Sequence, residues 1–248
     1  MCERGIIINV ERGYFMNSVD LKKNASYSES EIIEAIRKAT PSVSETKVKW
    51  LLFDLERTHV ITRIGSKKYV TGGRLYTADL SEPAANIDSA VSQHYPEIEY
   101  VIWESSQLNE WINLMLAKNV IFVEVESGLK DYVFSFLQEQ YGRTHTVLLD
   151  PDHEMLSRYI DNDPVVVRQL FSRSPRGRKG HRIILEKLLV DVVSDKLLKS
   201  MIGTNDREEI VRGMSVNYSL NITKILAYAK RRRCESEIQQ ILEPRYDR

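Results

Sequence analysis

The sequence predicts a mixed α/β (α+β) fold: an N-terminal winged helix-turn-helix, followed by a mixed α/β domain that ends in a helical segment. Three observations predict it. An amphipathic helix is followed at once by a basic hairpin within residues 42–76, apolar strands alternate with helices from residue 97 to 170, and the chain after residue 184 has helical periodicity. The expected boundaries are 16–78 for the winged helix, 79–96 for a linker and 97–248 for the second domain.

The start of the chain leaves two alternatives open. Residues 5–10 fit either a short strand or a disordered leader, and residues 19–23 fit the first helical turn that a winged helix requires. A helix is expected from Ser28, because Ser28 and Glu31 have the spacing of a capping box. Its apolar face then consists of Ile32, Ile33, Ile36 and Ala39.

The helix at the centre of the prediction starts at Ser44, whose hydroxyl can cap the free N–H groups. Its buried stripe consists of Val48, Leu51, Leu52 and Leu55, which recur at helical spacing. Its opposite face carries Thr46, Trp50, Phe53 and Arg57, with Lys47 and Lys49 beside them. Aromatic and cationic side chains on one outer face favour contact with a phosphate-bearing surface. The alternative is that Trp50 and Phe53 lie beneath the second half of the chain.

A basic hairpin follows this helix. After Thr58 the apolar period changes from helical to alternating, and Gly65-Ser66 fits a two-residue turn. Residues 42–76 contain seven Lys and Arg against three Asp and Glu, in a chain whose formal net charge is zero. A basic hairpin alone is usually a solvated loop, but behind this helix the local charge excess predicts a polyanion-binding surface. The expected DNA-binding residues are Ser44, Thr46, Lys47, Lys49, Trp50, Arg57, Arg63, Ser66, Lys67 and Lys68.

The composition is that of a globular protein, with 248 residues, 42% hydrophobic and 28% charged. No window approaches about eighteen consecutive apolar residues, so no transmembrane helix is expected. The N-terminal segment is too acidic, and its apolar run too short, for a secretion signal. Cys2 and Cys234 lack metal-type spacing, and reduced thiols in a cytoplasmic protein are the simplest interpretation.

In the second domain the pattern predicts strands at 100–103, 120–126, 146–149 and 165–170, and helices at 107–116, 129–140 and 154–160. Two basic stretches come later. One carries Arg173, Arg176, Arg178, Lys179 and Arg182 without an acid, and the other, Lys230 to Arg233, closes a helix. A solvated loop and helix-dipole compensation are the ordinary interpretations, and nucleic-acid contact is the alternative.

An enzyme hypothesis rests on Asp150 and Asp152, which follow a strand, and on Glu124 of another strand. Together they define the alternative of a metal-dependent, nucleic-acid-processing site. A turn at Asp-Pro and an Asp cap on the next helix explain two of these residues equally well. No metal-type histidine pair, phosphate-binding glycine loop or nucleophile elbow accompanies them. The sequence therefore predicts no catalytic residue, no metal and no cofactor.

One ordered series of segments spans residues 27 to 242: Ser44-Glu45-Thr46 with Val48 and Trp50, Ile64-Gly65 with Tyr69, then VIWESSQLNEWINL, VIFVEVE, VLLDPD, ILEKLLVDVVSDK and NYSLNITKILAYAKRR. In this order they resemble AbiEi-type antitoxins of type IV toxin-antitoxin systems. The resemblance implies an autorepressor that binds double-stranded promoter DNA. It also implies an antitoxin with a functional or weak physical link to a nucleotidyltransferase-like toxin encoded beside it. A further hypothesis is a protein-binding module whose winged helix binds the toxin instead of DNA.

The sequence departs from the family in two places, the turn of the wing and the poorly formed first helix of the winged helix. The wing has Ser66-Lys67-Lys68 where the family has Arg-Gly, which keeps the charge but alters the turn. Glu186, Lys187 and Asp191 match the family's Leu-Glu-Lys…Asp signature at the start of the helical part. These three form either an intrahelical ion network, worth roughly 0.2–0.5 kcal/mol per pair, or an interaction surface for toxin action.

Overall fold

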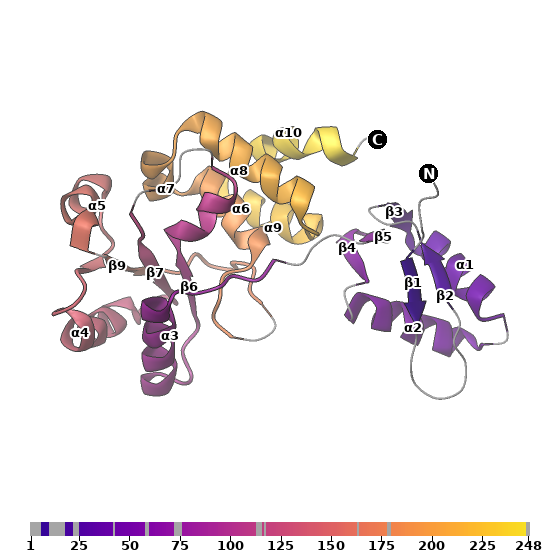
Figure 1. Ribbon diagram of the computed structural model, residues 1–248, viewed down its shortest axis with the longest axis horizontal. Helices are drawn as coiled ribbons and strands as arrows, with labels where there is room; N and C mark the ends of the chain where they lie inside the picture. Colours follow the sequence, from indigo (N-terminus) through magenta and orange to yellow (C-terminus); the bar gives the residue numbers. More distant parts are fainter. Residues whose placement is uncertain are drawn as a thin grey trace. The chain divides into compact units, whose positions relative to one another are not determined.

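The computed structural model describes residues 6–9, 18–21, 25–41, 43–57, 60–71, 76–112, 116, 118–162, 164–177 and 180–246. The chain divides into two compact units, residues 1–76 with 217–224 and residues 77–216 with 225–248. The fold is mixed α/β with a helical C-terminal segment, as predicted (Figure 1). Among the described residues, no helix has both the length and the apolar character needed to cross a membrane.

The first unit contains an antiparallel pair of strands, β1 (Ile6–Asn9) and β2 (Ser18–Leu21). Of the two alternatives for the first residues, the strand is therefore the one observed. The helical turn predicted at 19–23 is wrong, because 19–21 belong to β2. Val19 and Leu21 are buried in the core of this unit. Pairing with β1 gives hydrogen-bond partners to backbone N–H and C=O groups that a single helical turn would leave without partners.

Two helices and a hairpin complete this unit: α1 (Glu29–Ala39), α2 (Glu45–Arg57), β4 (Ile61–Gly65) and β5 (Lys68–Thr71). The strand β3 (Ser26–Ser28) pairs with the other edge of β5, so the sheet order is β3-β5-β4. Ser28 and Glu31 form the predicted capping box. The Ser44 hydroxyl accepts from the Lys47 N–H at 3.4 Å, as expected of the α2 cap.

The hairpin turn lies one residue later than predicted. Gly65 pairs with Lys68, so the turn is Ser66-Lys67 and not Gly65-Ser66. A register shift between Arg63 and Gly65 accommodates the difference, and Lys67 takes the left-handed conformation with φ of 58°. The turn thereby presents Ser66, Lys67 and Lys68 as exposed residues at the tip of the hairpin.

The second unit is built on a four-stranded sheet of β6 (Tyr100–Glu104), β7 (Ile121–Val125), β8 (Val147–Leu149) and β9 (Val165–Gln169). The strand order is β6-β7-β9-β8, with β6 antiparallel and the other three parallel. The helices α4 (Lys130–Tyr141) and α5 (His153–Tyr159) connect the parallel strands, and the 3₁₀ helix η2 (Ile160–Asn162) follows α5.

Where a helix was predicted at 107–116, the structure has a 3₁₀ helix, η1 (Ser105–Glu110), and residues 113–115 lie outside the described residues. The Trp111 N–H donates to the Leu108 carbonyl at 3.1 Å, a three-residue spacing that closes η1. Short polar side chains such as Ser106 and Asn109 compete for backbone groups and disfavour an α-helix here. The Asn109 side chain accepts from the Leu116 N–H at 2.8 Å.

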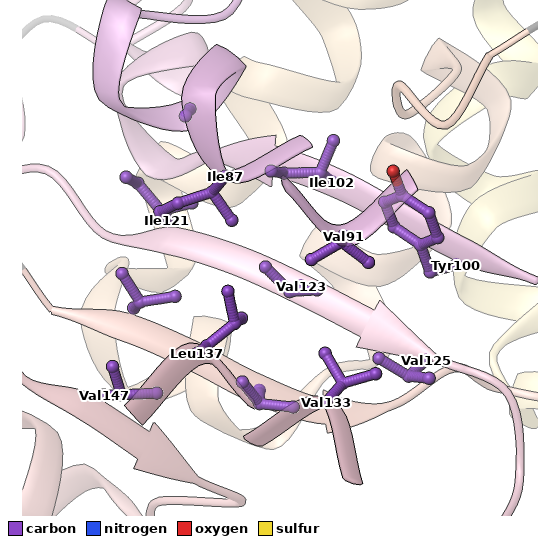
Figure 2. Close-up of a cluster of buried hydrophobic side chains, with 13 residues drawn as sticks. Ile87, Val91, Tyr100, Ile102, Ile121, Val123, Val125, Val133, Leu137 and Val147 are labelled. Atoms are coloured by element: carbon purple, nitrogen blue, oxygen red, sulfur yellow. The ribbon is translucent and has the colours of Figure 1, made fainter. Parts of the chain in front are cut away.

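The segment 79–96 was predicted as a linker with one helix around residues 87–94, and the helix that it contains begins five residues earlier. Its helix α3 (Glu82–His94) buries Ala84, Ile87 and Val91 against alternate strand residues of the sheet, together with α4 (Figure 2). Pro83 lies in the first turn of α3, where a missing N–H costs nothing, and Ser81 caps the helix. This segment therefore belongs to the core of the second unit.

The chain ends in five helices, α6 (Leu185–Ser194), α7 (Lys196–Met201), α8 (Thr204–Asn217), α9 (Ile222–Arg232) and α10 (Glu235–Tyr246). The helix α6 lies on the sheet face opposite α3 and α4, because its Lys187 contacts Glu124 of β7. Its apolar stripe, which recurs at helical spacing in the sequence, is buried and consists of Leu185, Leu188, Leu189, Val192 and Val193.

Candidate functional site

The outward face of α2 carries exposed aromatic side chains. Trp50 is 48% exposed and Phe53 is 55% exposed, so neither ring packs into the core of the first unit. The ammonium of Lys47 lies 4.7 Å from the centre of the Trp50 ring, at cation–π distance. Thr46, Lys49 and Arg57 are exposed beside them. The structure therefore places these six predicted residues on one outer helix face, opposite the buried stripe of α2.

The predicted cations differ in their partners. Arg57 pairs with Asp54 at 2.5 Å. Among the residues that the structure describes, no carboxylate forms an ion pair with the other predicted cations of α2 and the turn, Lys47, Lys49, Lys67 and Lys68. These four lysines are therefore available to neutralise phosphate groups.

Arg63 links the β4–β5 hairpin to α2. It pairs with Glu56 of α2 at 3.5 Å, its guanidinium lies 4.9 Å from the centre of the Tyr69 ring, and it donates to the Tyr69 hydroxyl. Tyr69 is fully buried in β5. The Glu29 N–H donates to the Lys67 carbonyl at 2.8 Å, which holds the turn against the start of α1. These contacts fix the turn relative to the outward face of α2.

A buried ion network lies on the other unit's sheet, beneath α6. Glu124 of β7 accepts from Arg168 Nη2 at 2.6 Å, from Trp103 Nε1 at 3.0 Å and from Lys187 Nζ at 2.5 Å. Glu124 is 2% exposed and Lys187 is fully buried. A buried charge is tolerated only when it has such partners. Glu124 of the sheet and Lys187 of α6 therefore depend on each other, and their ion pair joins α6 to the sheet.

The network continues along α6 to α9. Asp191 contacts Lys187 through Oδ2 and accepts from the Tyr228 hydroxyl through Oδ1 at 2.8 Å. Asp195 lies 3.2 Å from Arg168 Nη1 and 3.5 Å from Arg232 Nη2. The signature residues Lys187 and Asp191 thus form an ion network, but one that reaches well beyond their own helix. Their burial excludes them as a surface for toxin action, whereas Glu186 is only partly buried.

Sequence reasoning missed five members of this network: Trp103, Arg168, Asp195, Tyr228 and Arg232. A signal was present in the sheet, because Glu124 and Arg168 each interrupt an apolar strand. Lys187 and Asp191 gave no such signal, because they lie on the face of α6 opposite its apolar stripe, where charged side chains are usual. Charged residues at buried positions require partners. Which charges become partners depends on strand order, and the sequence does not give that order.

Acid should weaken this network. Burial, the largest single influence, raises the pKa of Glu124, but the charges of Lys187 and Arg168 outweigh it and hold that pKa well below its ordinary value of 4.5. Because folding lowers the pKa, Glu124 contributes stability above pH 4.5 that is lost as the pH falls below it. We expect Glu124→Gln to be less stable at pH 7 by about 3 kcal/mol and to lose less further stability in acid than the wild type. Urea unfolding at a series of pH values measures both effects. If the free energies of unfolding of the wild type and of Glu124→Gln fall in parallel as the pH is lowered, Glu124 does not have this role.

The three acids of the enzyme hypothesis are not gathered into one metal-type cluster. Glu124 is occupied by Lys187 and Arg168, Asp150 pairs with Lys130, and Asp152 caps α5 by accepting from the Met155 N–H at 2.8 Å. Across the described residues, no group of three His, Cys, Asp or Glu side chains is arranged to hold a metal ion.

A cleft of about 660 Å³ opens at the carboxyl ends of β8 and β9. Its lining residues are Asp150, Pro151, Asp152, His153, Arg168, Phe171, Ser194, Asp195, Lys196, Leu197, Ser200 and Arg232. Two of these, Arg168 and Arg232, also belong to the ion network. Ligands of open α/β sheets commonly bind outside the carboxyl ends of the parallel strands, so this cleft is a second candidate site.

Comparison with known proteins identifies the family but no activity. Residues 47–247 match the model described as "Family of unknown function (DUF6577)". The chain belongs to this family. A comparison with curated proteins gave no match. The crystal structure of RV2827C protein from Mycobacterium tuberculosis is similar at 10% identity, covering 89% of this chain and 76% of that one, with a TM-score of 0.26. At this TM-score the likeness informs neither the fold nor the function of the DUF6577 chain.

Proposed function

We propose that this DUF6577 protein is a transcriptional regulator whose first unit binds duplex DNA as a winged helix. The observation that carries the proposal is the outward face of α2, where Trp50 and Phe53 are exposed beside Lys47 and Lys49. Exposed aromatic rings among cations that lack carboxylate partners are typical of a surface that meets a polyanion.

In this proposal α2 is the recognition helix and the β4–β5 hairpin is the wing. Thr46, Lys49 and Trp50 enter the major groove, while Lys67 and Lys68 hold phosphates or the adjacent minor groove. Arg63 positions the wing through its contacts with Glu56 and Tyr69. The charge of Arg57 is partly neutralised by its ion pair with Asp54. The buried stripe of α2 and the contacts of Arg63 support a fixed spacing between helix and wing.

The aromatic face can be tested without disturbing the core. We expect Trp50→Ala/Phe53→Ala to change the free energy of unfolding by less than about 0.5 kcal/mol, because both rings are exposed, and to weaken binding to the gene's own promoter DNA about tenfold. Fluorescence anisotropy at one salt concentration measures the affinity. Tyr132→Ala is the matched control, since Tyr132 is an aromatic residue of the second unit with 65% exposure. Unchanged promoter affinity in the double variant would remove this face from DNA binding.

The resemblance to AbiEi-type antitoxins extends the proposal to autorepression and to the neutralisation of a nucleotidyltransferase-like toxin. The test is co-expression: growth should be restored when the chain is produced together with such a toxin from the neighbouring reading frame. Failure to restore growth, with the promoter still repressed, would leave a regulator that is not an antitoxin. Co-purification of the two proteins with no DNA affinity would favour the protein-binding module instead.

A further inference from the structure

Two segments that are distant in sequence lie against each other in the second unit. Arg231 Nη2 donates to the Ser172 hydroxyl at 2.5 Å, across 59 residues of sequence. The guanidinium of Arg232 lies 4.5 Å from the centre of the Phe171 ring, and this ring meets Tyr228 edge-on at 6.2 Å between centres. These contacts fix the segment after β9 on the C-terminal turn of α9.

This juxtaposition gathers exposed cations into what we call the α9 basic cluster, defined as Arg173, Lys230, Arg231 and Arg233. In the described parts of the chain, none of the four forms an ion pair with a carboxylate. By contrast, Arg176 of the same basic stretch pairs with Glu99 at 2.5 Å. The α9 basic cluster therefore has positive charge that no described carboxylate neutralises.

The helix dipole explains only part of the cluster. Cations in the last turn of a helix are stabilised by about 0.3–1 kcal/mol each, which accounts for Lys230 and Arg231. Arg173 does not belong to α9, and Arg233 lies beyond its end in the left-handed conformation, with φ of 59°. Arg173 and Arg233 therefore join the cluster through the tertiary fold, and their presence favours an external anionic partner.

The cluster borders the cleft at the carboxyl ends of β8 and β9. Phe171 is 38% exposed and lines the cleft, together with Arg232 and Lys196. The Asp195 carboxylate at the same opening is already engaged: it accepts from the Leu197 and Leu198 N–H groups at 3.0 and 3.1 Å and pairs with Arg168. Asp150 and Asp152 also line the cleft, and they are engaged by Lys130 and by the Met155 N–H. The opening thus combines an accessible aromatic ring with the cations of α9.

We propose that this surface binds single-stranded nucleic acid, with phosphates on the α9 basic cluster and one base in the cleft against Phe171. Single strands are bound by cationic surfaces that follow the backbone and by aromatic rings on which bases stack. A duplex does not offer such a base, because its bases are paired and stacked inside the helix. The site is separate from α2 and does not depend on the proposed binding of duplex DNA.

The experiment titrates the full-length chain into a short labelled oligothymidylate over a series of salt concentrations. We expect Arg173→Ser/Arg231→Ser to weaken binding and to reduce the slope of log K against log salt by about 1.4, since each phosphate contact on a single strand contributes about 0.7. We expect Phe171→Leu to weaken binding about tenfold with an unchanged slope, because leucine preserves the apolar contact with Tyr228 but provides no stacking surface. An abasic oligonucleotide of the same length should bind more weakly to the wild type.

One control variant locates the site. Arg143→Ser/Arg212→Ser removes two exposed cations of the second unit that lie outside the cluster, and it should bind the oligothymidylate as the wild type does. The inference is overturned if the oligothymidylate does not bind, if this control weakens binding as much as the cluster variant, or if Phe171→Leu and the abasic probe behave as the wild type.

Discussion

Lys187→Met is expected to lower the free energy of unfolding by about 3–5 kcal/mol, because it leaves one negative charge of a buried network without compensation. The ion network has three carboxylates, Glu124, Asp191 and Asp195, and three cations, Arg168, Lys187 and Arg232. Burial lowers the pKa of Lys187, but Asp191 and Glu124 outweigh it and raise that pKa, so the lysine is charged in the folded state. Methionine has a similar length but no charge, and the network would become net negative. Urea denaturation at neutral pH measures the loss.

Two further variants separate charge from packing. Lys199→Met removes an exposed lysine of α7 and should change stability by less than about 0.5 kcal/mol. Glu124→Gln/Lys187→Met restores the balance of charge, so its loss should be smaller than the sum of the two single losses by about 1–2 kcal/mol. If Lys187→Met costs less than about 1 kcal/mol, the network does not hold α6 on the sheet.

Lys67→Glu/Lys68→Glu is expected to reduce the affinity for promoter DNA about 100-fold, roughly tenfold for each reversed charge. Both lysines are exposed at the tip of the hairpin and lack a carboxylate partner among the described residues. If each contacts a phosphate, the slope of log K against log salt should also fall in magnitude by about 1.8, because each contact on a duplex contributes about 0.9. Anisotropy titrations at several salt concentrations give both quantities.

The matched control for this variant is Arg143→Glu/Arg212→Glu, which reverses the same number of exposed charges in the second unit. It should leave the promoter affinity within about twofold of the wild type, because exposed charges that touch no phosphate act only through screened, long-range attraction. Equal losses in the two double variants would mean that net charge, and not the hairpin, governs binding. Unchanged affinity in both would remove the wing from the mechanism.

The elements predicted best are those whose signal is local. The capping box of α1, the Ser44 cap and the apolar stripe of α2 depend on residues within a few positions of one another. The structure has both caps, and it buries Val48, Leu51 and Leu55 of the stripe, and Leu52 partly. Strands β7 and β9 were likewise predicted from continuous apolar runs. Two errors occurred where distant partners decide the conformation: residues 19–21 pair with β1 as a strand, and α3 packs on the sheet although its segment was predicted as a linker with a shorter helix.

By itself, the sequence determined the sheet strands of the second unit and the helices α4 and α5 to within one residue, which face of α2 is apolar, and that the region around α2 carries excess positive charge. These properties follow from spacing along one chain. Only the tertiary structure decided that Glu124, Lys187 and Arg168 share one buried network, and that the segment after β9 lies on the end of α9 beside the cleft. Both contacts join residues far apart in the chain, and their formation depends on strand order and helix packing, which no local pattern encodes.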